Sequence, residues 1–476
     1  MKTYPLYLNG DWVQTRDTMK VVNPATGEAF GAMSVIGRAE VAKAIERAHT
    51  AFVSWRKQAG KVRGEYLHKI ANELEGRKDE VARTITLENG KPLAQSVAEL
   101  ALTIDHLRWF AEEARRAYGR VVPHQVDGKR HLVIKAPMGV VGAISPWNFP
   151  LVLSVRKVAP ALAAGCTVIL KPASATPLSC VAFAECVHAA QLPPNTFQLV
   201  AGKASDIAQE FLDNPLCRKI SFTGSTEVGR ALIRGAAEGV KPLSLELGGQ
   251  APCIVFDDAD LDRAIEGVLI AKFRNTGQSC IAANRIYAQR GIYDKFVELL
   301  VQKVKAMKVG DGLDDGVQIG PLINEDAVKR AIAHVQDAIA QGAKLLTGGK
   351  RANNAKGFFF EPTVLVNVLS KALCMREETF APIAAVAKFD TEAEVVQQAN
   401  SLPFGLSAYV FTRDLSRAFR MMEDIDAGMM GINDGVPTTS QSPFGGMKQS
   451  GWGRELGIEG MDAFLDTKHI ALGIGS

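Results

Sequence analysis

Residues 140–150 read VVGAISPWNFP, a run of five mostly apolar residues that ends in a polar, proline-bracketed turn. Three similar apolar runs follow at 167–170, 197–200 and 220–223, separated by segments of helical spacing. Strands that alternate with helices form a mostly parallel sheet with helices on both faces. The stretch therefore predicts an α/β fold.

Each of the four runs is followed by a polar or glycine-containing segment. These segments are Ser145 to Pro150, Lys171 to Ser174, Gly202, and Gly224 to Gly229. Because ligands of such sheets bind beyond the carboxyl ends of the strands, we expect these segments to converge on one edge around a ligand.

The segment GSTEVG at 224–229 lies between an expected strand and an expected helix. Free backbone N–H groups at a helix start can face a cofactor phosphate, although such a turn is more often plain strand-to-helix punctuation. Arg230 and Ala231 stand where a P-loop needs Lys and Ser or Thr, which argues against a kinase or NTPase.

The chain's 476 residues exceed the roughly 250 to 300 at which one hydrophobic core usually stops growing, so two or more domains are expected. Apolar residues at helical spacing over 62–88 and from Leu100 to Phe110 predict a helix-rich early part. A second α/β domain is predicted after Gly249, from a helical stretch at 260–274 and strand-like runs at 285–288, 408–411 and 431–433.

Composition excludes several classes of protein. Hydrophobic residues make up 47% and charged residues 22% of the chain, which argues against intrinsic disorder. A net charge of +4 from 55 basic and 51 acidic residues is too small and too mixed for a nucleic-acid partner. Residues 1–12 offer neither a secretory signal nor a membrane span, so we expect a cytoplasmic protein.

The seven cysteines include no CxxC pair and no histidine partners at zinc-finger spacing, so we expect neither disulfides nor a metal. Cys166, Cys186 and Cys253 lie among apolar residues, where a free thiol usually acts as a small buried group. The eight histidines form no HExxH motif and no triad-like group, and none is assigned a catalytic role.

Cys280 and Glu246 are the candidate nucleophile and base. Cys280 follows the polar turn Asn275 to Ser279, where a reachable thiol would be placed. For a lone cysteine a structural role is the better explanation, but Glu246 lies between apolar residues before a glycine pair. Desolvation there would raise its pKa towards the range of a general base.

Lys171 and Ser174 bear on the choice of cofactor. A dinucleotide site often holds the ribose hydroxyls with a carboxylate, whereas a 2′-phosphate needs a cation without a competing carboxylate. Lys171 with Ser174 fits the second case, although an isolated lysine more often only ends a strand in solvent.

Six motifs in order resemble the aldehyde dehydrogenase superfamily over nearly the whole chain. They are PWNFP at 146–150, FTGSTEVG at 222–229, LELGG at 245–249, FRNTGQSC at 273–280, EETF at 377–380 and PFGG at 443–446. Within the superfamily, the chain most resembles bacterial succinate-semialdehyde dehydrogenases.

The resemblance implies an NAD(P)+-dependent oxidation of an aldehyde to a carboxylate. It makes Cys280 the nucleophile that forms a thiohemiacetal and then a thioester, with the Asn148 amide and the Cys280 N–H stabilising the oxyanion. Glu246 would deprotonate the hydrolytic water, and Lys157 would lie near the site.

The resemblance also implies the cofactor residues. It places the adenosine ribose near Lys171 and Ser174, the pyrophosphate near Ser225, and the nicotinamide ribose near Glu378 with Phe380 beside it. Many NAD-preferring members have Glu where Ser174 stands, so we expect NADP+ to be used well alongside NAD+. The full set is Trp147, Lys171, Ser174, Gly224, Ser225, Gly229, Glu378 and Phe380.

Two positions depart from the family pattern. Ala381 stands where EETFGP usually has Gly, and its methyl group would tighten or shift the loop that holds Glu378 and Phe380. Ala282 stands where some semialdehyde dehydrogenases have a second Cys, so this chain cannot form that redox pair.

For the substrate, the resemblance matches Arg156, Arg274 and, more weakly, Thr438 to positions that bind a distal carboxylate, as in succinate semialdehyde. Either arginine would instead form an internal ion pair if its role were structural. Glutarate semialdehyde, α-ketoglutarate semialdehyde and lactaldehyde stay open as substrates. A coenzyme A-acylating reaction and a non-catalytic structural protein also stay open. Glu246 argues against the first, and a structural protein should have lost Cys280 or Glu246.

The implied architecture has three parts: a Rossmann-like cofactor domain at 1–117 and 137–248, a catalytic domain at 249–435, and a small β oligomerisation element at 118–136 and 456–476. An edge strand in this element gives a reason to pair with a second copy, and we expect a homodimer or homotetramer.

Overall fold

The computed structural model describes residues 1–352 and 356–474. Its largest sheet has eight strands, and its five central strands run parallel. Four of these five lie at the apolar runs predicted above, and the fifth, at 243–246, was not predicted. In spatial order the eight strands are β22 (Gly451–Trp452), β12 (Leu243–Glu246), β11 (Cys217–Thr223), β8 (Val140–Ile144), β9 (Thr167–Lys171), β10 (Phe197–Leu199), β2 (Leu6–Leu8) and β3 (Asp11–Val13).

Helices pack on this sheet, and their apolar faces join its strands in one core. The stretch 62–88, predicted as one helical run, is two helices that meet at Arg77, whose φ of −112° and ψ of 18° leave the helical range. The helices are α1 (Arg38–Trp55), α2 (Gly60–Gly76), α3 (Lys78–Asn89), α4 (Leu93–Glu113), α5 (Pro150–Ala164), α6 (Leu178–Ala189), α7 (Ala204–Asp213) and α8 (Thr226–Ala237).

A second, seven-stranded sheet forms the other half of the body. Its neighbouring strands are parallel except for β15 and β16. In order they are β15 (Lys344–Thr347), β16 (Thr363–Val366), β17 (Ile383–Phe389), β14 (Ala283–Gln289), β13 (Ala251–Val255), β19 (Ser407–Phe411) and β20 (Met429–Ile432). The predicted strand 431–433 thus begins and ends earlier than expected.

Alternate residues of these strands enter two separate cores: Ile254 packs on one face of the sheet, and Cys253 and Val255 pack on the other. The helices that cover the two faces are α9 (Leu261–Phe273), α10 (Arg290–Lys305), α11 (Glu325–Ala340), α12 (Leu373–Arg376), α13 (Glu392–Asn400) and α14 (Leu415–Asp424).

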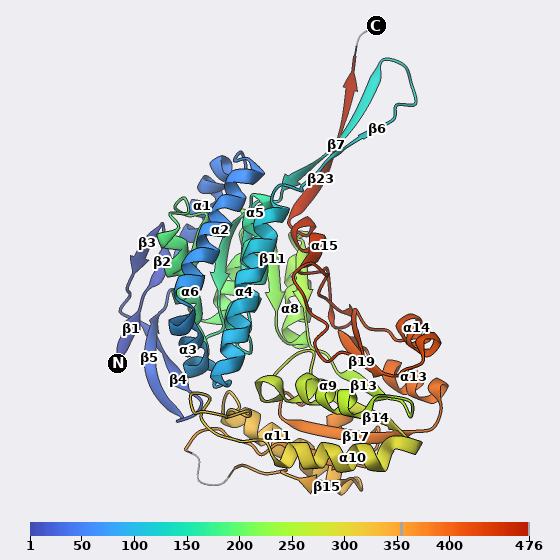
Figure 1. Ribbon diagram of the computed structural model, residues 1–476. Coiled ribbons are helices and arrows are strands. Elements are labelled where there is room, and N and C mark those ends of the chain that lie inside the picture. The colour runs from blue at the N-terminus through green and yellow to red at the C-terminus, as the bar shows by residue number, and fades with distance from the viewer. Residues whose placement is uncertain (353–355, 475–476) are drawn as a thin grey trace.

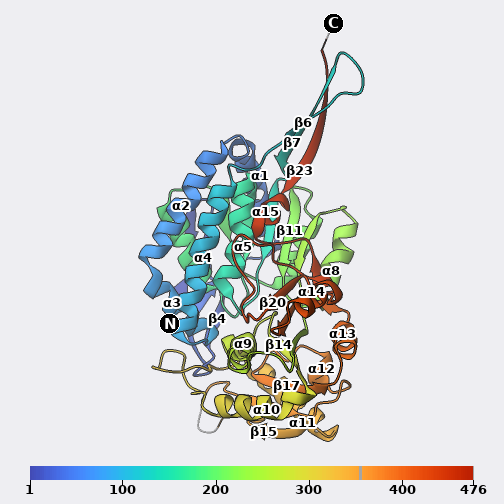
Figure 2. The ribbon, with the colours of Figure 1, turned by 45° about the vertical axis from the view of Figure 1, so that its right-hand side comes forward.

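Three strands form an arm that projects from the body (Figures 1 and 2). They are β6 (Arg120–Val122), β7 (Lys129–Pro137) and β23 (Leu465–Gly473), which follows α15 (Gly457–Asp462). β7 lies between the other two, and β23 pairs antiparallel with its whole length. The smaller sheets comprise β1 (Lys2–Tyr4), β5 (Glu28–Ser34) and β4 (Thr18–Asn23), and β18 (Phe404–Gly405) with β21 (Met447–Lys448).

The two large sheets bring opposite strand ends together. Glu246 ends β12, whereas Cys280 and Glu378 lie shortly before the amino ends of β14 and β17. The segments that leave the first sheet therefore meet the segments that enter the second. Within the described residues, no helix combines the length and the apolar character needed to cross a membrane.

Candidate active site

Cys280 lies where two cavities meet. A cavity of about 110 Å³ is lined by Cys280 together with Arg156, Arg274, Thr438 and Phe444. A larger one, of about 330 Å³, is lined by Cys280 and by residues from both halves of the body. Among these are the predicted residues Trp147, Asn148, Gly224, Ser225, Glu246, Glu378 and Phe380. The half-buried thiol therefore faces one space suited to a small molecule and one suited to a larger partner.

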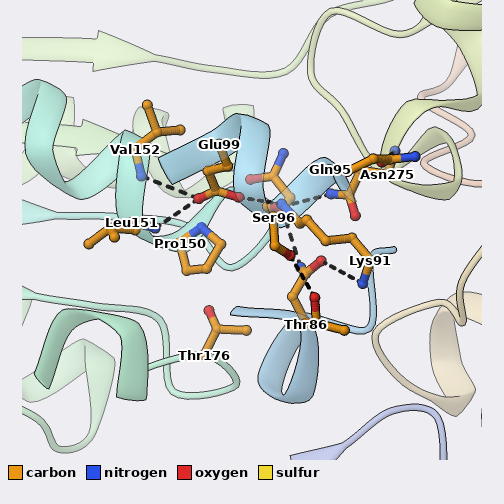
Figure 3. Close-up of polar contacts among 12 residues, drawn as sticks. Thr86, Lys91, Gln95, Ser96, Glu99, Pro150, Leu151, Val152, Thr176 and Asn275 are labelled. Atoms are coloured by element: carbon orange, nitrogen blue, oxygen red, sulfur yellow. Dashed lines mark hydrogen bonds and ion pairs between the residues drawn. The ribbon is translucent and has the colours of Figure 1, made fainter. Parts of the chain in front are cut away.

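The loop before Cys280 has an unusual backbone. Asn275, Thr276 and Gly277 all have left-handed conformations, with φ of 50°, 57° and 73°, of which only the glycine adopts such a value without strain. The amide of Asn275 donates to the Asn148 carbonyl at 2.7 Å, and its backbone N–H donates to Gln95 Oε1 at 2.7 Å (Figure 3). These bonds hold a strained turn that presents the thiol to both cavities.

Burial raises the pKa of the Cys280 thiol to about 12, and the carboxyl group of Glu378 adds to this rise. The thiol therefore needs a base to take its proton before it can attack. The other six cysteines are buried, and all seven are free.

Asn148 follows β8 and is 3% exposed. Its side-chain amide donates to the Gln278 carbonyl at 3.2 Å, and its own carbonyl also accepts from Lys91 Nζ at 2.8 Å. With its carbonyl fixed on several donors, the amide of Asn148 has a defined position at the wall of the larger cavity.

A buried ion pair supports this position (Figure 3). Lys91 Nζ lies 2.5 Å from Glu99 Oε2, and both side chains are fully buried. The other Glu99 oxygen accepts from the backbone N–H groups of Leu151 and Val152 at 3.0 and 3.3 Å, which caps the first turn of α5. One pair thus connects the end of α3, helix α4 and the start of α5.

Glu246 is 4% exposed, and its Oε2 has no hydrogen-bond partner among the described residues. Burial, and next the nearby Glu455, raise the pKa of Glu246 well above its usual range, as expected from its apolar neighbours. Lys157 donates to Thr223 Oγ1 at 2.6 Å and forms a buried ion pair with Glu455. A carboxyl group with a raised pKa and a free oxygen is suited to accept a proton.

Glycines leave room for the two cavity carboxylates. A Cβ on Gly445 would lie 2.9 Å from Glu246 Oε1, and one on Gly248 would lie 2.6 Å from Glu378 Oε2. Glu378 accepts from the Gly249 N–H at 2.9 Å, and burial raises its pKa to about 7. The glycine pairs of the LELGG and PFGG motifs therefore serve close approach to these carboxylates.

The structure separates the predicted cofactor residues into two groups. Trp147, Gly224, Ser225, Glu378 and Phe380 line the larger cavity, and the rings of Trp147 and Phe380 meet edge-on with centroids 5.7 Å apart. Lys171, Ser174 and Gly229 do not line it.

Each of these three has its own surroundings. Lys171 ends β9 beside β8 and is 4% exposed, and burial lowers its pKa to about 8. Ser174 is exposed in the following loop. Gly229 is buried under Leu247, so it serves helix packing, because a Cβ there would lie 2.6 Å from that side chain.

Ala381 adds no positive φ of its own to the loop that holds Glu378 and Phe380, in which the strained residue is Phe380, with a φ of 42°. The Ala381 side chain is fully buried in the core of the second sheet. The methyl group is thus accommodated by packing.

Arg156 and Arg274 line the smaller cavity together. Arg156 is 4% exposed; its Nε donates to His106 Nε2 at 3.2 Å, and its Cζ lies 4.4 Å from the centre of the Phe444 ring. The Arg274 Cζ lies 5.3 Å from the centre of the Phe149 ring. Over residues 1–352 and 356–474 neither forms the internal ion pair considered above, because nearby Glu99 and Glu455 are paired with lysines.

Several site residues escaped the sequence reasoning, among them Glu455, Glu99, Lys91 and His106. Glu455 and Lys157 are 298 residues apart in the sequence, and His106 and Ser440 are 334 residues apart, so no local sequence pattern predicts either contact. The stretches NGK at 89–91, which contains Lys91, and IDHLR at 104–108, which contains His106, carry no spacing that points to a site.

Comparison with known proteins identifies the class to which this fold and site belong. The model of the aldehyde dehydrogenase family matches residues 12–470, and the chain belongs to this family. The predicted superfamily and α/β fold are thereby confirmed.

Particular relatives are similar over nearly their full length. The succinate-semialdehyde dehydrogenase [NADP(+)] GabD of Escherichia coli (strain K12) is 48% identical, covering 98% of this chain and 97% of that protein. The glutarate-semialdehyde dehydrogenase of Pseudomonas putida is 47% identical with the same coverage. The crystal structure of an E. coli NADP dependent enzyme gives a TM-score of 0.98 at 46% identity, covering 99% of this chain and 98% of that one.

Proposed function

We propose that this protein oxidises an aldehyde with a distal carboxylate, best represented by succinate semialdehyde, to the corresponding acid with NADP+ or NAD+. The observation that carries the proposal is the pair of arginines beside Cys280. Burying a guanidinium without a partner is costly, and a carboxylate suits its planar donors. Arg156 and Arg274 face the cavity of the thiol without an ion-pair partner in the described chain, so an anionic ligand would compensate them.

The catalytic roles follow from chemistry. Glu246 takes the proton of the Cys280 thiol and passes it to solvent, and Cys280 Sγ forms a bond to the aldehyde carbon. The carbonyl oxygen, which gains negative charge, is stabilised by the Asn148 amide and the Cys280 N–H. The chemistry that a bound NAD+ or NADP+ supplies is acceptance of the hydride from that carbon. Glu246 then takes a proton from the water that attacks the thioester carbon, and the C–S bond breaks to release the carboxylate and the thiol.

Lys157 would act through Glu455 and Thr223. Its ammonium lies between these two groups at the end of β11. There it adds a positive charge to the surroundings of Glu246, which opposes the rise of that residue's pKa. We assign it to the electrostatics of the base.

The larger cavity supports the cofactor proposal. Trp147, Phe380 and Glu378 would hold the nicotinamide end, and Gly224 and Ser225 at the start of α8 would hold the pyrophosphate. Lys171 is a buried ammonium whose pKa is lowered by burial alone. It would meet the adenosine ribose together with Ser174 and favour a 2′-phosphate, and the NADP+ named for the GabD relative agrees.

Domain division, assembly and location are part of the proposal. We infer a cofactor domain at 1–117 and 137–248, a catalytic domain at 249–435 and an oligomerisation element at 118–136 and 456–476. The two large sheets and the arm support this division, except that β22 at 451–452 joins the first sheet from outside these ranges. Within the described residues β23 pairs only with β7, so its outer edge offers backbone groups to a second copy, which supports a homodimer or homotetramer. We place the enzyme in the cytoplasm.

Glutarate semialdehyde is the second candidate substrate, because a relative of that name is 47% identical. Glutarate semialdehyde carries the same distal carboxylate on a longer carbon chain, so the depth of the cavity decides which of the two semialdehydes fits better. α-Ketoglutarate semialdehyde shares the carboxylate, whereas lactaldehyde lacks the group that the arginines would bind.

The test compares initial rates for succinate semialdehyde, glutarate semialdehyde and butanal with NADP+ and NAD+, followed by the absorbance of the reduced nucleotide. We expect kcat/KM to favour a semialdehyde and Arg156→Met to lower that value by about 30-fold or more, with little change for butanal. Exposed Arg16→Met is the matched control. If butanal is as good a substrate and Arg156→Met changes nothing, the carboxylate proposal is wrong.

A further inference from the structure

Arg156 has an asymmetric environment. Of its three nitrogens only Nε donates to another described residue, His106 Nε2 on α4 at 3.2 Å. The two Nη groups make no hydrogen bond within residues 1–352 and 356–474, and the residue lines the cavity of Cys280. One side of the guanidinium is thus fixed to the protein while the bidentate end stays available for a ligand.

This contact determines the tautomer of His106. An arginine N–H can only donate, so Nε2 must accept and the proton of the neutral ring must lie on Nδ1. Nδ1 lies 2.8 Å from Ser440 Oγ and therefore donates to it. Ser440 Oγ in turn donates to Asp105 Oδ2, since an ionised carboxylate only accepts.

The result is a directed chain from Arg156 through His106 and Ser440 to Asp105. His106 is fully buried, and burial and the neighbouring Arg156 hold its pKa well below the usual range, so the ring stays neutral. The exposed carboxylate of Asp105 gives the chain a negative end. The chain also ties α4 and α5 to the loop that carries Thr438 and Phe444 of the cavity wall.

We propose that His106 is the positioning residue that orients Arg156 towards an anionic distal group and thereby sets the preference for such aldehydes. The inference rests on the proposed function, because it assigns the cause of a selectivity that the arginines imply. His106 does not touch the reacting atoms. It acts by accepting the Nε proton, which fixes the plane of the guanidinium.

The experiment compares His106→Leu, which removes the acceptor, with His106→Gln, which offers an oxygen to Arg156 and an N–H to Ser440. We expect His106→Leu to lower kcat/KM for succinate semialdehyde by about 10- to 150-fold, the range for a hydrogen bond to a charged group. The loss should appear mainly in KM, with kcat/KM for butanal almost unchanged. His106→Gln should recover most of the loss.

If His106 had a purely structural role, His106→Leu would lower kcat/KM for both substrates together, and His106→Gln would not restore it. His334 is a buried histidine of α11 that does not belong to the hydrogen-bonded chain from Arg156 to Asp105. His334→Leu is therefore the matched control and should leave the ratio of kcat/KM for the two substrates unchanged. If His106→Leu does not fold, Ser440→Ala and Asp105→Asn decide, because each weakens the same chain and should raise KM for the semialdehyde alone.

The two failures are distinguishable. If wild type shows no preference for the semialdehyde over butanal, the proposed function fails. If wild type shows the preference and Arg156→Met removes it while the His106, Ser440 and Asp105 variants keep it, the positioning role alone is refuted.

Discussion

The buried pair of Lys91 and Glu99 should affect stability and rate together. Glu99→Gln removes the carboxylate that faces Lys91 Nζ at 2.5 Å but keeps one oxygen that can accept from the Leu151 N–H. Breaking a buried ion pair by removing one partner costs about 3–5 kcal/mol. We expect the lower end of this range because Lys91 retains the Asn148 carbonyl at 2.8 Å and the Phe149 ring at 3.9 Å.

Lys91→Met should cost a similar amount and should also lower kcat, because the Asn148 carbonyl loses a donor. The double variant should be more stable than the sum of the two losses predicts, by about 2 kcal/mol, because it leaves no unpaired buried charge. Hydrogen exchange of peptides from α4 and the start of α5 measures the local opening free energies, and initial rates measure kcat.

The exposed pair of Lys295 and Glu298, at 3.0 Å, is the matched control, and its variants should stay within about 0.5 kcal/mol of wild type. Additive losses in the Lys91 and Glu99 double variant would refute the coupling. An unchanged kcat in Lys91→Met would refute the link to Asn148.

Three further predictions concern the base, the cofactor and the strained turn. Glu246→Gln should lower kcat by about 100- to 10,000-fold. It should also remove the increase of kcat with pH that accompanies ionisation of Glu246 at its raised pKa, since only the carboxylate accepts a proton. A pH–rate profile of the variant that keeps this increase would refute the assignment. Ser174→Glu should lower kcat/KM for NADP+ far more than for NAD+, through repulsion of the 2′-phosphate, and equal losses in paired initial-rate assays would contradict the placement. Gly277→Ala should lower the melting temperature and the activity, because its Cβ would lie 2.2 Å from the Ala381 carbonyl oxygen. Gly316→Ala, at φ +72° with no atom of the described residues within 4 Å, is the control and should cost only about 1 kcal/mol. Equal effects of the two substitutions would exclude the clash as the cause.

The sequence predicted the elements whose pattern is complete within a short window. The runs at 140–144, 167–170 and 220–223 lie in β8, β9 and β11, because strands buried on both faces are continuously apolar. The strands of residues 2–34 were not predicted. The burial of β4, for example, alternates regularly, but its apolar Val22 is exposed and its polar Asn23 is buried, so the sequence pattern does not show the alternation. β1 has no buried residue.

The candidate site divides in the same way. Cys280, Glu246 and Asn148 lie in glycine- or proline-containing motifs after strands or before them, and the structure places all three on one cavity. Glu455 and His106 lie in stretches that read as ordinary polar positions of a turn and a helix. Their role depends on contacts that only the folded chain creates.

The last segment of the chain passes from the cavity wall to the arm without a break, from Ser440 and Phe444 through Glu455 to β23. Synthesis proceeds from the amino end, and early segments fold first. A nascent chain that has emerged only as far as residue 439 already carries Cys280 but has neither Phe444 against Arg156 nor Glu455 beside Lys157. The thiol therefore acquires its finished surroundings only after residues 440–455 have been synthesised and have folded onto the site.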